Sequence, residues 1–334
     1  MRRKPLHLPP LCVILDYMKD LIATLQKHAV NDRAPRFRDK RGHYASSAMT
    51  CLRDQYRAAM GEPASNPTDF LGKMKMMVGS GVENELVKTY LSQLHWYGVH
   101  LIGTQVQVGG SDPVRWDGNL DALAAKRSES GDETFVIECK TKSGKGADDL
   151  AKNLNPQVSY VAQLGLYLRD LSSKGVTNEG CLLYFLLSSF RHGEILQFNY
   201  RYNPENGIVT CYEAVSSTGF HQELSQTFDT SIPLKRWQKL EEHIAKKEIP
   251  KGEFLYKYPL TEELVLAQSD DTRRKMITGN KVIGDWEYIY SPYFFTNLNA
   301  DGLTLGYTPE EKQFITRIHL KIHPKSRIGT KKAG

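Results

Sequence analysis

The segment from Asp117 to Asp121 (DGNLD), followed after a polar gap by Phe135 to Lys140 (FVIECK), decides the fold prediction. A carboxylate ends the first segment, and a second carboxylate and a lysine lie two positions apart in the next. Because side chains alternate between the faces of a strand, Glu138 and Lys140 share one face and Cys139 lies on the other. Unpaired charge is costly to bury, whereas converging carboxylates suit a hard divalent cation. The pattern therefore predicts a metal site at the ends of two strands.

Helix and strand signals surround this segment. Ser46 and Ser47 are N-cap residues for one predicted helix, and Pro156 begins another. The order of helices and strands predicts an α/β chain with a central mixed sheet flanked by helices. The predicted helices cover 10–28, 46–59, 69–97, 156–171 and 233–247, the predicted strands cover 99–108, 114–125, 134–141, 181–190 and 195–202, and 142–154 is expected to be a loop.

Composition sets broad limits. The 334 residues allow one large domain or two smaller ones. An apolar content of 40% and a charged content of 25% are ordinary for a globular chain. The net charge of +6 permits a polyanionic partner without establishing one. Basic residues gather at both ends of the chain, where a solvated tail and a nucleic-acid contact are equally good readings.

Cysteine usage and hydropathy bear on the compartment. The five cysteines are widely spaced and form no CxxC pair, which argues against a disulfide framework and against a self-contained zinc site. The apolar stretch from Leu11 to Leu15 is too short to span a bilayer, and Asp16 follows it at once. We therefore expect a reducing, cytoplasmic setting and no membrane partner.

Taken in chain order, these residues resemble the PD-(D/E)XK nuclease superfamily. Asp121 followed by Glu138-x-Lys140 matches its signature, and Gln163 to Tyr167 resembles the QxxxY helix of one branch. That branch contains RecB nuclease domains, lambda exonuclease and the CRISPR-adaptation nucleases. Gly79 to Glu83 is similar to its upstream helix, which supplies an extra metal ligand. Ser47 to Arg53 is similar to the SxxxCxR opening of the iron–sulfur members.

The resemblance covers about 46–250 and implies a domain organisation. A restriction-endonuclease-like core, with a central mixed sheet flanked by helices, is expected at 46–260. An N-terminal helix and basic link at 1–45 precede it. A C-terminal aromatic closing segment, a helix and a basic tail at 261–334 follow it.

One segment departs from the iron–sulfur members. Those members close their cluster with cysteines near the C-terminus, but here Tyr288 and Ser291 stand where thiolates are expected, and no cysteine lies beyond Cys211. Four thiolates of this chain cannot then hold a cluster. We expect no iron–sulfur cluster, with Cys51 packing as a small hydrophobe and Trp286 and its aromatic neighbours closing the segment by burial.

The resemblance also implies roles for individual residues. Asp121 and Glu138 would hold the metal, with Glu83 and the backbone carbonyl of Cys139 as further ligands. Lys140 would orient or help to deprotonate the attacking water. The alternative readings are surface carboxylates and a lysine in an ordinary salt bridge. Asp117 is a rival of Asp121 on the same strand, and the spacing Gly118-x-x-Asp121 favours Asp121.

Other side chains are expected to act beside this set. Gln163 and Tyr167 lie four residues apart on one helical face and would serve catalysis and contact DNA. The alternative is a polar edge on a packed helix. Arg53, Lys142 and Lys145 would bind DNA phosphates, although a solvated loop explains the two lysines almost as well.

The function implied is a metal-dependent deoxyribonuclease that uses Mg²⁺, for which Mn²⁺ can substitute. The branch favours an exonuclease in DNA recombination or processing of a phage or mobile element, located in the host cytoplasm if the chain is viral. DNA is the expected partner, and a single-strand annealing or recombination protein and an oligomer are compatible with this role. A structure- or site-specific endonuclease of the superfamily and a non-catalytic nucleic-acid-binding subunit remain as alternatives.

Overall fold

A computed structural model describes most of the chain and divides it into two compact units. The first unit comprises residues 1–49 and 68–239, and the second comprises 50–67 and 240–334. The expected division grouped 46–67 with the sheet, whereas the contacts group 50–67 with the C-terminal residues. The structure describes residues 43–66, 68, 70–85, 89, 91, 93, 95, 98–128, 131–188 and 192–323. The predicted helix at 10–28 and the basic tail after 323 lie outside these residues.

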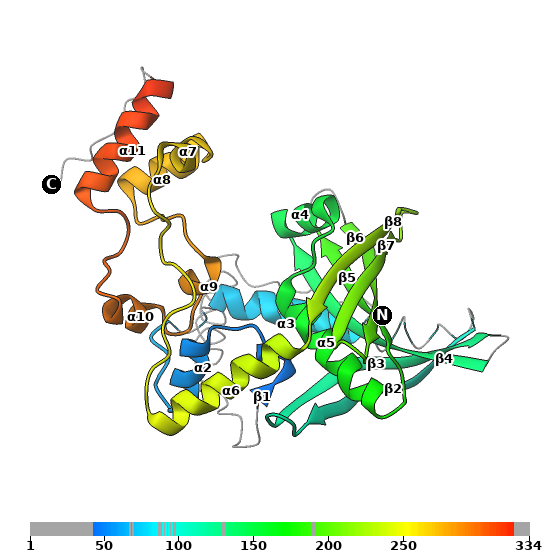
Figure 1. Cartoon of the computed structure of the whole chain (residues 1–334). Coiled ribbons are helices and arrows are strands. Elements are labelled where there is room, and N and C mark those ends of the chain that lie inside the picture. The colour runs from blue at the N-terminus through cyan, green and yellow to red at the C-terminus, as the bar shows by residue number, and fades with distance from the viewer. Residues whose placement is uncertain are drawn as a thin grey trace, which may run out of the picture. The chain divides into compact units, whose positions relative to one another are not determined.

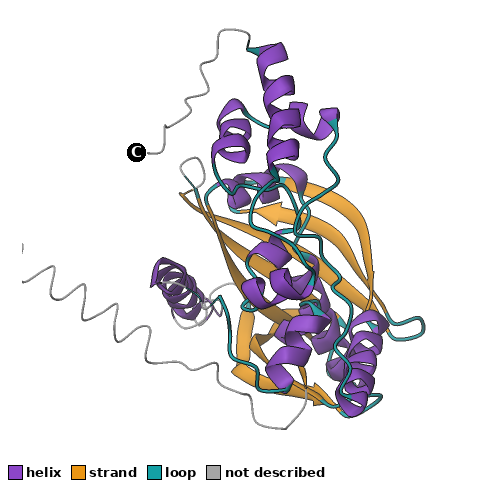
Figure 2. Ribbon diagram, turned by 90° about the vertical axis from the view of Figure 1, so that its left-hand side faces the viewer, coloured by secondary structure: helices purple, strands orange, loops and turns teal. Residues whose placement is uncertain are grey.

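The first unit is built on one mixed sheet of eight strands, which confirms the predicted fold class. Most neighbours pair antiparallel, but β1 with β3 and β4 with β5 pair parallel. Figure 1 shows helices on either side of the sheet, and Figure 2 shows how its strands curve. The strands are β1 (His43–Tyr44), β2 (Val99–Gly110), β3 (Trp116–Ser128), β4 (Gly131–Ser143), β5 (Glu179–Leu187), β6 (His192–Asn203), β7 (Ile208–Ser216) and β8 (His221–Asp229).

The helices of this unit are α3 (Phe70–Glu85), α4 (Lys145–Asn153), α5 (Val158–Ser173) and the first half of α6 (Ser231–Lys246), with a 3-10 turn η1 (Ala45–Ser47). The loop expected at 142–154 is wrong, because an amphipathic helix forms there with Ala147 and Leu150 buried. The helix expected from residue 46 begins only at Leu52, and Ser47 instead donates its hydroxyl to the Tyr44 carbonyl. The sequence prediction also lacked β1, β7 and β8.

Helix α5 is the central helix of the unit and contacts strands β2, β4, β5, β6 and β8. Its apolar residues are nearly all buried, including Leu164, Leu166 and Leu168. A helix that is apolar on most sides must be enclosed. One close approach depends on glycine, because a Cβ at Gly118 in β3 would lie 2.6 Å from the Tyr167 ring. The absence of a side chain at Gly118 therefore lets the Tyr167 ring pack directly against β3.

The second unit is helical and has its own core. It contains α2 (Leu52–Ala59), α7 (Glu262–Leu266), α8 (Asp270–Thr278), α9 (Trp286–Ile289), α10 (Phe294–Ala300) and α11 (Pro309–Ile322). Tyr288 and Phe294 lie in the buried cluster of this unit together with Val265, Met276 and Ile315. This part of the closing segment is buried as expected.

Three of the aromatic residues do not follow that expectation. Trp286 is 54% exposed, Tyr290 is 76% exposed and Phe295 is 44% exposed. The four-residue helix α9 turns only one side inward, and that side carries Tyr288. Full burial of Trp286 is therefore wrong.

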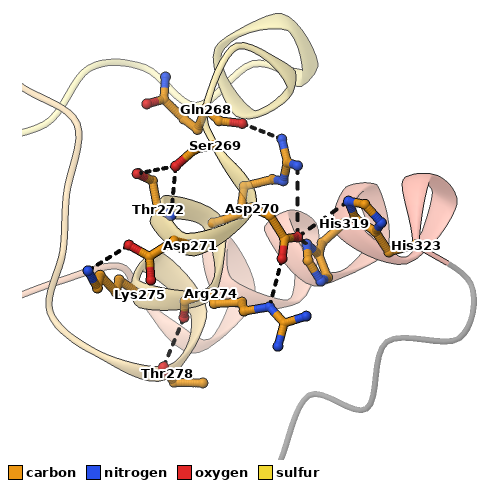
Figure 3. Close-up of polar contacts among 11 residues, drawn as sticks. Gln268, Ser269, Asp270, Asp271, Thr272, Arg274, Lys275, Thr278, His319 and His323 are labelled. Atoms are coloured by element: carbon orange, nitrogen blue, oxygen red, sulfur yellow. Dashed lines mark hydrogen bonds and ion pairs between the residues drawn. The ribbon is translucent and has the colours of Figure 1, made fainter.

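A polar group joins α8 to α11 inside the second unit (Figure 3). Asp270 Oδ1 lies 3.4 Å from His319 Nδ1 and 3.3 Å from His323 Nε2. The other oxygen of Asp270 accepts a hydrogen bond of 2.9 Å from Arg274. His319 is fully buried. Burial lowers the pKa of His319, and the Asp270 charge only partly opposes this.

Candidate active site

The candidate site lies where β3 changes its neighbour. Strand β2 pairs with β3 from Trp116 to Lys126, so β1 and β4 must share the other edge of β3. On that edge β1 pairs with Trp116 and Asp117, and β4 pairs from Ala122 onward. Residues 118–121 therefore face the opening between β1 and β4. Asp121 stands at the last position of this opening.

The edge of β4 that leaves β3 is closed by carboxylates instead of a strand. Among the described strands, none pairs with this edge beyond Ile137. The Cys139 amide donates to Asp121 Oδ2 at 2.8 Å, and the Thr141 amide donates to Glu83 Oε1 at 3.2 Å. Backbone donors require partners, and a charged acceptor makes the bond stronger. The free edge thereby holds two acids from distant elements, β3 and α3, beside the same strand.

Glu138 and Lys140 point from β4 to one face, as the alternation predicted. Lys140 Nζ lies 2.5 Å from Glu138 Oε1, and both side chains are largely buried. The register of β3 with β4, extended by one residue, places Asp121 opposite Glu138. The second oxygen of Glu138, Oε2, is buried and accepts no hydrogen bond from any residue that the structure describes.

Helix α5 supports this strand through three contacts, which we term the polar ladder. Gln163 Nε2 donates to Glu138 Oε1 at 2.8 Å. The Lys140 ammonium lies 5.1 Å from the centre of the Tyr160 ring, a cation–π contact. At the far end, Lys142 Nζ donates to Gln157 Oε1 at 3.5 Å. Alternate residues of β4 are thus matched with residues three positions apart on α5 or on its N-cap.

Tyr167 continues the support toward β3. Gln163 Nε2 lies 2.8 Å from the Tyr167 hydroxyl, and that hydroxyl donates to the Asn119 carbonyl at 3.1 Å. The carbonyl belongs to the part of β3 that faces the opening. Gln163 and Tyr167 therefore connect Glu138 to the strand that carries Asp121, as two residues of one helical face can.

Three acids surround one lysine, and burial together with these charges shifts the pKa values of Glu138, Glu83 and Lys140. Burial raises the pKa of Glu138 to about 7, Lys140 opposes the shift, and Asp121 adds to it. Burial likewise raises the pKa of Glu83; the Lys140 charge opposes this shift and the Asp121 charge adds to it. The pKa of Lys140 is raised because the Glu138 and Asp121 charges outweigh its burial. Surplus negative charge of this kind is typical of functional sites.

The donor set fits a hard divalent cation. Mg²⁺ usually takes one or two protein carboxylates and completes its shell with water and substrate oxygens. Asp121 and Glu138 lie opposite each other, and Glu138 Oε2 is a buried acceptor in need of a partner. In the described part of the chain, no three His, Cys, Asp or Glu side chains already converge as a metal-binding group. A cation here would be held first by Asp121 and Glu138 and not by a preformed protein cage.

The remaining predicted residues fall in different places. The Cys139 side chain packs in a buried cluster with Ile137 and Leu183, on the face opposite Glu138. Lys142 is half-buried at the end of the polar ladder, and Lys145 is exposed at the start of α4. Asp117 pairs with Tyr44 of β1 and lies four residues before Asp121, the residue of β3 that is opposite Glu138. The geometry therefore favours Asp121 over Asp117.

Arg53 is the one predicted site residue that belongs to the second unit. Its guanidinium is buried and binds both oxygens of Asp301, at 2.7 and 3.0 Å. Its carbon Cζ also lies 5.7 Å from the centre of the Tyr288 ring. A role in binding DNA stays a prediction for Arg53, and the geometry shows a structural role.

Sequence reasoning missed Gln105 of β2, whose amide donates to Asp121 Oδ1 at 3.2 Å. The pairing of β2 with β3 places Gln105 in the same transverse row as Asp121. The turn between these strands is long, and register cannot be read across such a turn from the sequence. The repeated polar positions in Thr104-Gln105-Val106-Gln107 were the only signal.

Comparisons with known proteins add little to this geometry. No protein-family model matches the chain, and no curated protein matches it. Among solved structures, the chain is similar to an alkaline exonuclease (LHK-Exo) from Laribacter hongkongensis, with 13% identity and a TM-score of 0.35 over 61% of this chain and 90% of that chain. The chain is likewise similar to LHK-Exo in complex with dAMP, with 13% identity and a TM-score of 0.34 over 61% of this chain and 87% of that chain. We draw no conclusion about fold or function from a likeness at this level.

Within the described residues, no helix has the length and apolar composition needed to cross a membrane.

Proposed function

We propose that the first unit is a metal-dependent deoxyribonuclease and that its active site is formed by Asp121, Glu138 and Lys140. The observation that carries the proposal is the arrangement at the free edge of β4. A lysine ammonium lies 2.5 Å from a buried carboxylate whose other oxygen is unsatisfied among the described residues. An unpaired buried acceptor is costly, and a cation bound beside this oxygen would remove that cost.

Each residue has a role that follows from its position. Asp121 and Glu138 would hold Mg²⁺, with Glu83 and the Cys139 carbonyl as the further ligands proposed from the family resemblance. When bound, the metal would polarise a phosphodiester and lower the pKa of a coordinated water. Lys140 keeps its positive charge because of the surrounding acids, so it is suited to orient a water and to stabilise charge that develops on phosphate oxygens.

The contacts from α5 hold the side chains of Glu138 and Lys140 in fixed positions. Gln163 fixes the Glu138 oxygen that faces Lys140, and Tyr160 limits the movement of the ammonium. Tyr167 fixes Gln163 in turn. Sites held within small tolerances by such contacts are the ones that accelerate reactions. Lys142 and Lys145 would contact the phosphates that flank the reacting one.

The substrate class and the mode of cleavage rest on the family resemblance. We propose DNA as the substrate and an exonuclease as the mode, in recombination or processing of phage or mobile-element DNA. A structure- or site-specific endonuclease is the second candidate. The two differ on closed-circular DNA, which has no end for an exonuclease to attack.

The test is digestion of linear, nicked and covalently closed circular DNA with Mg²⁺, with Mn²⁺ or with EDTA. We expect the linear form to be degraded progressively, the closed form to persist, and EDTA to stop cleavage. Early linearisation of the closed circle would establish the endonuclease. Unchanged DNA in every metal-containing reaction, together with retained DNA binding, would support the non-catalytic subunit and overturn the proposal.

A further inference from the structure

Gln105 adopts a backbone conformation that its position does not explain. Its φ of 51° lies in the left-handed region, where residues with a Cβ are uncommon. Two other described residues without glycine's freedom share the region, Leu154 and Lys247. Both end helices, where a left-handed residue is ordinary. Gln105 instead lies inside β2, between Thr104 and Val106, which both pair with β3.

The side chain at this position reaches the candidate site. Gln105 Nε2 donates to Asp121 Oδ1 at 3.2 Å, while the Cys139 amide donates to Asp121 Oδ2 at 2.8 Å. Each oxygen of the carboxylate is therefore held by one neighbouring strand. A carboxylate held at both oxygens cannot rotate freely about its last bond, so the direction of its remaining lone pairs is fixed.

The local energetics separate this contact from ordinary surface bonding. Gln105 is exposed, and an exposed hydrogen bond contributes little net stability. The left-handed backbone costs free energy for glutamine and would cost none for glycine. A strained residue whose contact contributes little to folding is better explained by function than by stability.

We propose that Gln105 is a positioning residue, which orients the Asp121 carboxylate toward the divalent cation. The inference rests on the proposed metal-dependent function and names a residue from β2 that neither the sequence motif nor the polar ladder contains. Gln105 acts through Asp121 and does not itself hold the metal. Partners that orient metal ligands change metal affinity or activity by about 10–100-fold when they are removed.

The test compares Gln105→Gly with Gln107→Gly. Gln107 is also exposed and lies on the same face of β2, paired with Asn119, but without a left-handed φ. For Gln105→Gly we expect a melting temperature at least equal to that of the wild type, because glycine relieves the strain. We also expect about 10–100-fold weaker Mn²⁺ binding in calorimetric titration of the DNA-free protein, and a similar loss of kcat on linear duplex DNA with little change in KM.

Gln107→Gly should show the opposite pattern. Glycine at an ordinary strand position weakens the strand, so the melting temperature should fall while Mn²⁺ affinity stays at the wild-type value. Wild-type Mn²⁺ affinity and turnover in Gln105→Gly would overturn the proposal, as would a fall in melting temperature equal to that of Gln107→Gly.

Asp121→Asn separates this inference from the proposed function. If Asp121→Asn abolishes Mn²⁺ binding and cleavage while Gln105→Gly does not weaken them, only the role of Gln105 is lost. If the wild type binds no Mn²⁺, or if Asp121→Asn behaves as the wild type, the proposed function fails, and the role of Gln105 fails with it.

Discussion

The two units bury charge in opposite ways. In the second unit, Asp301 neutralises the Arg53 charge and accepts hydrogen bonds from its two terminal nitrogens, while Arg53 Nε is buried without a partner among the described residues, and the Tyr288 hydroxyl donates to Asp301 at 2.6 Å. In the first unit, three carboxylates share one ammonium, and Glu138 keeps an oxygen without a partner among the described residues. A neutralised ion pair serves to hold a fold together, whereas a surplus of negative charge is typical of a site that binds a positively charged group. The comparison teaches that imbalance, and not burial alone, distinguishes a candidate active site.

The largest expected effect is the loss of cleavage in Lys140→Ala. Removing the ammonium takes away the group that steadies a water and developing charge, so turnover should fall by about 10²–10⁴-fold. DNA affinity should stay within a few-fold, because one phosphate contact among many is a small share of binding. Steady-state cleavage and filter binding measure the two. Lys126→Ala, an exposed lysine of β3, is the matched control, and equal activity in both variants would remove Lys140 from the site.

The second effect breaks the ion pair of Arg53 with Asp301. Asp301→Asn leaves the buried Arg53 guanidinium without its counter-charge, and we expect the free energy of unfolding to fall by about 3 kcal/mol. Urea denaturation followed by circular dichroism measures this change. Asp271→Asn is the control, because the Asp271 ion pair with Lys275 is exposed and should contribute less than about 1 kcal/mol. A stable Asp301→Asn protein would mean that this ion pair is not what holds the second unit together.

The third effect has the opposite sign and sharpens the contrast. Glu138→Gln removes one of three acids while an amide keeps a hydrogen-bonding group beside Gln163. We therefore expect the metal-free protein to gain about 1 kcal/mol in the free energy of unfolding, while cleavage is lost. Differential scanning calorimetry in EDTA checks the first part. Destabilisation as large as that of Asp301→Asn would place Glu138 among the structural ion pairs and contradict the comparison.

The smallest effect depends on pH and concerns His319. Burial lowers the pKa of this histidine, so the unfolded chain takes up its proton at a higher pH than the folded one. The free energy of unfolding should then fall as the pH drops below about 6.5, by at most about 1.4 kcal/mol per pH unit. Denaturation at pH 7.5 and 5.5 measures the change, and His319→Asn should reduce it. A pH response that is the same in both proteins would assign the effect to other groups.

The sequence predicted the parts of the fold that depend on local patterns. Alternation in β4 placed Glu138 and Lys140 on one face, and helical spacing placed Gln163 and Tyr167 together; both are found. It did not predict α4, where a glycine- and lysine-containing segment reads as a loop until Leu150 and Ala147 are buried by tertiary contact. Propensity is a weak prior that packing overrides.

The candidate site shows the same division. Motif residues could be named from order and spacing, because β4 and α5 are each single elements. Gln105 and the amides of Cys139 and Thr141 could not, because their roles depend on how β2, β3 and β4 are registered. The ion pair of Arg53 could not be predicted either, since nothing in the sequence near residue 53 points to Asp301, 248 positions away.

The free edge of β4 has a further consequence for the solubility of the protein. An open edge is a template on which another chain can add a strand, and such edges promote aggregation. Here Asp121 and Glu83 accept hydrogen bonds from the two backbone donors of this edge, the amides of Cys139 and Thr141, and a pair of negative charges repels an approaching backbone carbonyl. The same acids that would bind a cation thus also guard the sheet, so removing both would risk fibrous association as well as the loss of catalysis.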